Sequence, residues 1–316
     1  MRGWWQDLTD LVLPAECGGC GRPRAVLCPE CRTALSGAAP CRVRPVPEPP
    51  GLPAVHAAAR YGDAVRAVLL AHKERGALAL SGPLGAALAG AVRAGLREAR
   101  GGRAGGVSAG GVRSRAAGAP VLLVPVPSGR GAVRARGHDP ARRIALAAAG
   151  ELRRTGTPAR VLAVLRQRRA VVDQSGLNSR QRLGNLAGAL AVAPGGAALL
   201  GGGPVVLVDD LMTTGASLAE AARAVRQAAR EAVPAESAAA GGHGQAGVVA
   251  PGDHASVVYR GGSRERTGEQ RTAGAMEGSG DRKWTAPGMA GRNGSGDVIC
   301  AAVIAAMPDS FEINRN

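Results

Sequence analysis

The sequence predicts an α/β fold in which a mainly parallel sheet is flanked by helices, with a small cysteine-rich module in front. From about residue 54, short apolar runs alternate with segments of helical periodicity, an order typical of parallel sheets covered by helices. Apolar residues make up 45% of the 316 residues, which is enough for a substantial core, whereas aromatic residues make up only 2%. We therefore expect a core of Ala, Val and Leu.

The charge of the chain suggests an anionic ligand or partner. The net charge is +16, and residues 128–182 hold 13 Arg against Asp139, Glu151 and Asp173. The excess thus lies inside the predicted α/β region. No apolar run reaches the ~18–20 residues that a membrane helix needs, so no membrane span is expected. The N-terminus lacks the apolar stretch of a secretion signal, and we expect a cytoplasmic protein.

Residues 1–50 are predicted to form a metal-binding module and a linker. Cys17 and Cys20 form one C-x2-C pair, and Cys28 and Cys31 form a second. Two such pairs place four thiolates as structural zinc sites do, with no coordination position left open for catalysis. Two disulfides or free thiols are the alternative. The proline-rich stretch at 44–50 favours extended backbone and indicates a semi-rigid linker.

The elements of the α/β domain are expected in residues 51–233 together with 297–316. We expect strands at 54–61, 121–126, 160–165, 187–192, 205–209 and 298–305. We expect helices at 63–75, 78–100, 178–185 and 217–230, and a further helix that begins at Asp139-Pro140, with Asp139 as its N-cap. The glycine-rich segments 101–119 and 234–296 lack periodicity, so the first is predicted to be a flexible loop and the second a disordered insertion.

The most informative motif spans residues 205–217. A buried strand ends in Asp209 and Asp210, and a short loop with Thr213, Thr214 and Gly215 then leads into a helix at Ser217. Ligands of open α/β sheets bind at the carboxyl ends of strands, and a helix N-terminus attracts phosphate. The carboxylates can accept hydrogen bonds from ribose hydroxyls or hold Mg²⁺. The simpler interpretation is that Asp210 and Ser217 only cap the helix.

This motif resembles the phosphoribosyl-pyrophosphate signature of type I phosphoribosyltransferases. The resemblance implies that the acidic pair binds the ribose hydroxyls, that the loop binds the 5′-phosphate, and that Mg²⁺ accompanies the substrate. The positions that it assigns to substrate binding are Asp209, Asp210, Met212, Thr213, Thr214, Gly215, Ala216 and Ser217. A P-loop is absent, which argues against an ATPase or GTPase.

A second strand end, at Pro127 and Ser128, is the candidate pyrophosphate site. The resemblance implies that a loop there holds pyrophosphate through backbone N–H groups. Lys73, Arg134 and Arg136 are candidate charge partners for it, and the simpler interpretation of each is a solvated charge at a surface or helix end.

Further segments resemble the ComF family, amidophosphoribosyltransferase-like proteins linked to competence and DNA uptake. The resemblance rests on Arg136-Gly137-His138-Asp139, on the cysteine module, and on a polar series made of Arg166, Gln174, Arg182 and Asn185. It covers about residues 10–100, 120–230 and 298–316. His138 and Asp139 stand where the family usually has an aromatic residue and Asn, and the insertion at 234–296 has no counterpart. For His138 a loop or capping role is favoured over acid–base chemistry.

Two functions are compatible with these patterns. The first is a phosphoribosyltransferase that transfers the phosphoribosyl group to an acceptor, which the sequence does not identify. The second is a non-catalytic module that binds single-stranded DNA or a DNA-processing partner such as a helicase through its arginines. The scarcity of aromatic residues argues against the second, because single-strand platforms stack bases on aromatic rings.

Overall fold

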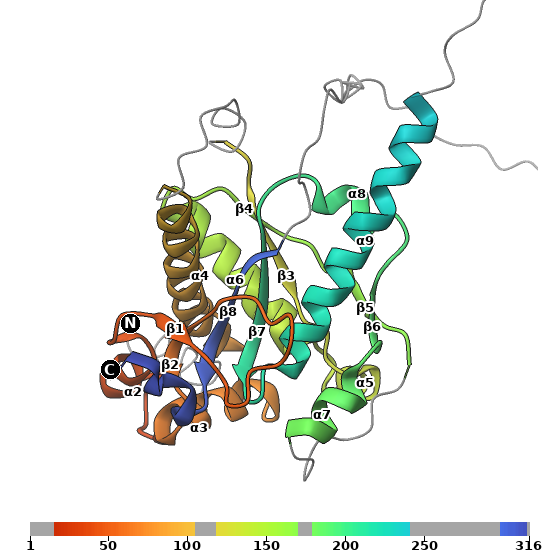
Figure 1. Cartoon of the computed structure of the whole chain (residues 1–316). Coiled ribbons are helices and arrows are strands. Elements are labelled where there is room, and N and C mark those ends of the chain that lie inside the picture. The colour runs from red at the N-terminus through yellow and green to blue at the C-terminus, as the bar shows by residue number, and fades with distance from the viewer. Residues whose placement is uncertain (1–15, 105–117, 170–178, 241–297, 315–316) are drawn as a thin grey trace, which may run out of the picture.

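The computed structural model describes residues 16–104, 118–169, 179–240 and 298–314. Its centre is a six-stranded sheet with the order β1-β2-β8-β7-β3-β4 (Figure 1). All neighbouring strands run parallel except β1, which pairs antiparallel with β2. This arrangement confirms the predicted α/β class. The strands are β1 (Cys41–Val43), β2 (Val55–Arg60), β3 (Val121–Pro125), β4 (Ala159–Val161), β7 (Val205–Met212) and β8 (Val298–Ala306).

Helices cover both faces of this sheet, and β7 shows why. Side chains of a strand alternate between the two faces, and Val206 and Val208 belong to one buried cluster while Val205 and Leu207 belong to the other. The first cluster packs under α3 (Asp63–Lys73), α4 (Ser81–Ala104) and α6 (Pro140–Arg154), and the second under α9 (Ala216–Ala240). A strand that is buried on both faces is apolar without alternation, which explains the continuous Val-Val-Leu-Val run.

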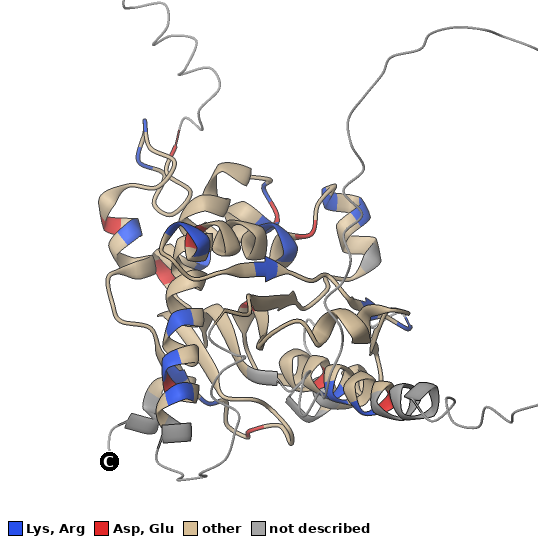
Figure 2. Ribbon diagram, turned by 90° about the horizontal axis from the view of Figure 1, so that it is seen from above, with Lys and Arg blue, Asp and Glu red and all other residues tan. Residues whose placement is uncertain are grey.

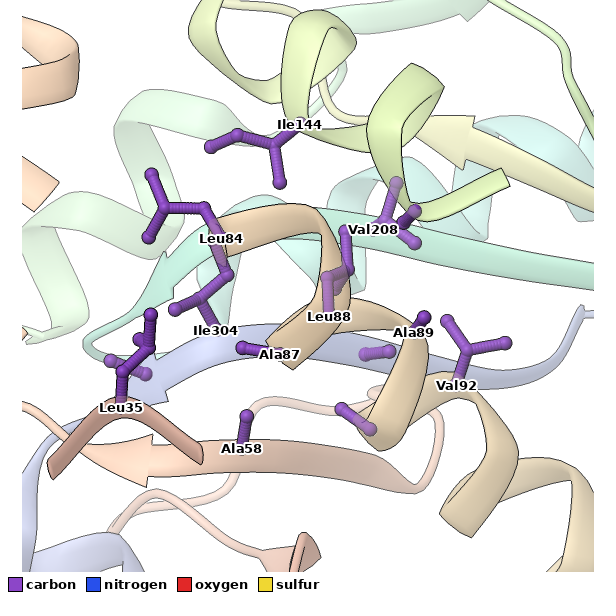
Figure 3. Packing of buried hydrophobic residues seen from close by; sticks show 14 of the residues in the cluster. Leu35, Ala58, Leu84, Ala87, Leu88, Ala89, Val92, Ile144, Val208 and Ile304 are labelled. Atoms are coloured by element: carbon purple, nitrogen blue, oxygen red, sulfur yellow. The ribbon is translucent and has the colours of Figure 1, made fainter. Parts of the chain in front are cut away.

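The first cluster is built from small and branched aliphatic residues, as the scarcity of aromatic residues predicts. Figure 3 shows leucines and alanines of α4 in one cluster with Ile144 of α6 and the strand residues Val208 and Ile304. Gly85 brings α4 and α6 together, because a Cβ atom there would lie 2.5 Å from the Cβ atom of Ala147. Side chains this small allow the helix backbones to approach closely, so the core is densely packed without aromatic rings.

The cysteine-bearing segment shares its core with the α/β domain. Helix α2 (Pro29–Ser36) contributes Leu35, which is fully buried in the cluster that α3 and α4 also form. The next strand, β1, is an edge strand of the main sheet. The sequence placed a boundary at residue 50, whereas the structure continues one core and one sheet across residues 17–60. A segment this small gains apolar contacts by packing on its neighbour.

Other differences concern where elements end. The predicted strand at 160–165 is two strands: β4 lies in the main sheet, and β5 (Leu165–Gln167) pairs antiparallel with β6 (Leu190–Val192) in a separate small sheet. The short helices α5 (Arg130–Arg136) and α8 (Gly196–Leu200) were not expected. Helix α4 continues to Ala104 and α9 to Ala240, into segments predicted to be irregular. The remainder of those segments, 105–117 and 241–297, lies outside the described residues.

Two predicted helices agree closely with the structure. Helix α6 begins as predicted, because the Asp139 side chain accepts a hydrogen bond from the Arg142 amide at 3.2 Å. Helix α7 spans Ser179–Leu186, and short 3-10 helices span Leu78–Leu80 and Pro308–Asn314.

Within the described ranges, one helical stretch, Leu78–Gly101, passes a test of length and composition for crossing a membrane, although no apolar run of that length was expected. An 18-residue segment of it has a mean hydropathy of 1.2, and 56% of that segment is buried inside the protein. The helix packs on α6, β2 and β8, and a core helix passes the same test.

Candidate functional site

The acidic pair lies near the end of β7, in the middle of the sheet. The strand continues past Asp209 to Met212, because it is paired with β8 through Met212 and Ala306. Its predicted end at Asp209 is therefore three residues too early. Asp210 is buried, whereas Asp209 keeps partial contact with solvent. The Asp210 amide donates a hydrogen bond to Oδ1 of Asp209 at 2.9 Å, which fixes the Asp209 carboxylate against the backbone.

The loop after β7 turns directly into α9. Gly215 has a φ of +73°, which a residue with a Cβ atom rarely adopts, and α9 starts at Ala216. The Ala219 amide donates to the Gly215 carbonyl at 2.9 Å, so the free amides of the first turn begin immediately after the loop. Thr213, Thr214 and Ser217 are partly exposed, as a phosphate site requires. Met212 and Ala216 are buried, so they can offer a ligand only their backbone.

Lys73 forms an ion pair inside this site. Its Nζ lies 2.9 Å from Oδ2 of Asp210, although 137 residues separate the two in the sequence. Burial lowers the pKa of Lys73, but the charge and hydrogen bond of Asp210 outweigh it and leave that pKa above its ordinary value. Burial, and then the charge of Asp210, raise the pKa of Asp209 well above its ordinary value. Lys73 was predicted to contact pyrophosphate, and the structure places it on the acidic pair.

A cavity of ≈ 420 Å³ opens beside the end of β3. Strands β3 and β7 are neighbours, and the Val126 amide donates to the Val208 carbonyl at 2.9 Å just before the two polar strand ends. The cavity brings together three residues that the sequence predicted, Pro127, Ser128 and Arg134, and neither acid of β7 lines it. Its other lining residues are Val133, Asp139, Leu165, Arg166 and Gln167.

Sequence reasoning missed one wall of this cavity. The wall is β5, whose Arg166 belonged to the polar series noted in the sequence, but no local pattern shows that this strand leaves the main sheet. Arg136, a predicted candidate for contact with pyrophosphate, does not line the cavity and forms an ion pair with Glu74 at the end of α3, with Nη2 3.0 Å from Oε1.

A buried carboxylate on α9 holds the β5–β6 sheet in place. Glu220 accepts a hydrogen bond from the Leu190 amide at 3.0 Å, and Arg223 donates to the Leu190 carbonyl at 2.9 Å. Arg223 also pairs with Glu220 at 2.7 Å. Burial alone would raise the pKa of Glu220, but the hydrogen bonds from Arg223 and the Leu190 amide hold that pKa below its ordinary value. This clamp fixes the wall that carries Arg166 and Gln167.

The four N-terminal cysteines lie close together and could bind a metal ion such as zinc. The sulfur atoms of Cys17, Cys20, Cys28 and Cys31 all lie within 4.8 Å of one another. Amides of Gly19 and Cys28 donate to the sulfur of Cys17 at 3.5 and 3.3 Å. Burial raises the pKa of the Cys17 thiol, but these hydrogen bonds outweigh it and lower that pKa to about 6, which favours the thiolate that a metal binds.

The basic residues are spread over the molecule. Figure 2 shows Lys and Arg on several separate helices and loops, with acidic residues among them. Many of the arginines between residues 134 and 169 are exposed, and these are Arg134, Arg142, Arg143, Arg153, Arg154, Arg160, Arg166, Arg168 and Arg169.

Together these features form two polar strand ends side by side: an acidic pair with a helix N-terminus on β7, and a cavity with two guanidinium groups beside β3. Such a site can bind a polyhydroxylated phosphate ester, with sugar hydroxyls on the carboxylates and phosphates on amides and arginines. No protein-family model matches the chain, and no curated protein matches it either.

Proposed function

We propose that this chain is a phosphoribosyltransferase-like protein of the ComF type that binds phosphoribosyl pyrophosphate or a related ribose phosphate. One observation carries the proposal: Asp209 and Asp210 lie beside a loop that turns at Gly215 into the N-terminus of α9, at the carboxyl end of a central parallel strand. An acidic pair and a phosphate-attracting helix end are thereby held within a few residues of each other.

Each residue has a defined part in the proposed site. Asp209 and Asp210 accept hydrogen bonds from the two ribose hydroxyls, and amides of the first turn of α9 and hydroxyls of the loop donate to the 5′-phosphate. The pyrophosphate extends toward Ser128 and Arg134 in the neighbouring cavity. Lys73 pairs with Asp210 and so holds that carboxylate in place before the ligand arrives. Transfer would break the bond between the anomeric carbon and pyrophosphate, and bound charges would stabilise the developing ribosyl cation.

The proposal includes two different metal ions, one with the ligand and one on the cysteines. Mg²⁺ would arrive with the ligand and offset the charge of pyrophosphate. Because Lys73 already neutralises Asp210, the acidic pair is not a ready cation site in the structure. The four cysteines would hold a structural zinc ion in a reducing compartment, the cytoplasm. By the same resemblance, we propose a role linked to DNA uptake.

Calorimetry tests the proposal directly. Phosphoribosyl pyrophosphate with Mg²⁺ should bind the wild type, and the Asp209→Asn/Asp210→Asn variant should bind at least tenfold more weakly because it loses charged hydrogen-bond acceptors, worth ~1.5–3 kcal/mol each. Asp309→Asn, an exposed acid after β8, is the matched control and should bind as the wild type does. Failure of the wild-type protein to bind would refute the proposal.

A second candidate function, binding of single-stranded DNA, is favoured by the exposed arginines between residues 134 and 169. The affinity for an oligonucleotide should then fall steeply as salt increases, since each neutralised phosphate releases counterions. Weak binding with no salt dependence would exclude it. Pyrophosphate release in a screen of nucleobases and amines would favour the enzyme instead.

A further inference from the structure

Two histidines, the buried His72 and the half-buried His138, lie against each other beside the acidic pair. His72 is in the last turn of α3, and His138 is in the turn between α5 and α6. Their ring centroids are 5.7 Å apart, with an angle of 64° between the ring planes. The two segments are also tied by the ion pair between Glu74 and Arg136. The histidines therefore lie where two separate parts of the chain are held together.

Hydrogen bonds orient both rings in the same way. Nδ1 of His72 lies 3.3 Å from the Ala77 carbonyl, and Nδ1 of His138 lies 3.1 Å from the Arg136 carbonyl. A carbonyl can only accept, so each Nδ1 carries a proton, and a neutral ring then keeps a lone pair on Nε2.

Neither lone pair has a partner among the described residues. Nε2 of His72 and Nε2 of His138 are both buried and make no hydrogen bond there, and the side chain of His72 is only 1% exposed. A buried polar atom without a partner is unfavourable, because it has given up its hydrogen bonds to water. Two Nε2 lone pairs cannot bond to each other, so a third species that accepts electron pairs would satisfy both.

The separation of the two rings is compatible with one shared metal ion. An imidazole nitrogen lies about 1.1 Å from its ring centroid and about 2.0–2.1 Å from a bound zinc ion, so two rings that share one ion have centroids at most about 6.4 Å apart. At the observed 5.7 Å, the two rings would subtend an angle of about 125° at the ion, within reach of tetrahedral coordination. Histidines that bind metals usually donate their other ring N–H to a carbonyl or carboxylate, as both do here.

We propose that His72 and His138 form a second metal site, in which their Nε2 atoms bind one zinc-class divalent ion. Neutral imidazole suits zinc, cobalt, nickel and copper, and water or a bound anion completes the coordination. The ion joins the end of α3 to the turn before α6, and so holds Lys73 in position against Asp210. This site is separate from the four cysteines and does not depend on binding of a ribose phosphate.

Metal stoichiometry tests the proposal on the full chain. His243 and His254, which lie outside the described residues, are replaced by Ala in every protein compared so that they cannot contribute. After equilibrium dialysis against micromolar zinc, the parent protein should hold two zinc ions per chain, and both His72→Gln and His138→Gln should hold one. His56→Gln is the matched control and should hold two, because buried His56 already pairs with Glu98 at 2.8 Å.

One zinc ion per chain in the parent, or two in both single variants, would overturn the proposal, and would mean that a bridging water or a shared proton satisfies the two rings. If the variants fail to fold, titration of the parent protein with cobalt tests the site instead. The first equivalent should show thiolate charge-transfer absorption, and the second should add none. X-ray absorption should then find two imidazole nitrogens on the second ion, and their absence there would equally overturn the site.

Discussion

Replacing Gly215 by alanine tests whether the loop after β7 depends on a backbone that only glycine adopts easily. The residue has a φ of +73°, and a Cβ atom there would lie 3.1 Å from Leu52 and 3.2 Å from Pro45. The left-handed backbone costs an L-residue about 1–2 kcal/mol, and the reduced freedom of the unfolded chain returns about 0.4–1 kcal/mol. Adding the tight contacts, we expect Gly215→Ala to lower the free energy of unfolding by about 1–3 kcal/mol.

Two other glycines separate these contributions in urea denaturation. Gly188 also has a positive φ, +69°, but an added Cβ would touch nothing within 4 Å, so Gly188→Ala measures the backbone cost alone. Gly150 lies inside α6 with open space around it, and Gly150→Ala should stabilise by about 0.5–1 kcal/mol. The reasoning is refuted if Gly215→Ala is as stable as the wild type. If it equals Gly188→Ala, the contacts with Leu52 and Pro45 contribute nothing.

Three further predictions concern ionic and metal interactions. In a double-mutant cycle of Lys73→Met and Asp210→Asn, the two residues should be coupled by about 1–2 kcal/mol, a value reduced by the 35% exposure of Lys73, and additive effects would contradict the ion pair. Glu220→Gln should lower the free energy of unfolding by about 1–2 kcal/mol at pH 7. The difference from the wild type should shrink as the pH falls below 4.5, because the hydrogen bonds that lower the pKa of Glu220 stabilise the fold only while its carboxylate is ionised. An equal difference at pH 4 and pH 7 would exclude this cause. Chelation of the cysteine-bound metal should raise hydrogen exchange over residues 16–36 and also in α3, which shares their core, and unchanged protection would contradict a structural metal.

Local features of the fold could be predicted from the sequence because local chemistry determines them. The start of α6 followed from Asp139 and Pro140, and the central strands followed from short apolar runs between turn signals. Strand ends were harder to predict. The apolar run at 160–165 was predicted to be one strand, but its two ends belong to different sheets. Hydrophobicity alone does not indicate which sheet a residue joins.

The part of the candidate site that lies in one continuous segment could be predicted, whereas contacts between distant segments could not. The motif around Asp209 and Gly215 is contiguous, so its parts were evident in the sequence. The pairing of Lys73 with Asp210, and of Arg136 with Glu74, joins segments 137 and 62 residues apart. Charge alone gives no means of choosing among 40 basic residues, so these partners required the three-dimensional arrangement.

The position of β8 has a consequence for how the protein is made. β8 lies between β2 and β7 and pairs with both, yet a ribosome synthesises it after every other strand of the sheet. During translation the facing edges of β2 and β7 therefore stay open until residue 306 has emerged, and open strand edges invite pairing with other chains. A nascent chain halted before residue 298 would carry two half-sheets with no strand to join them, and should require chaperones or be degraded.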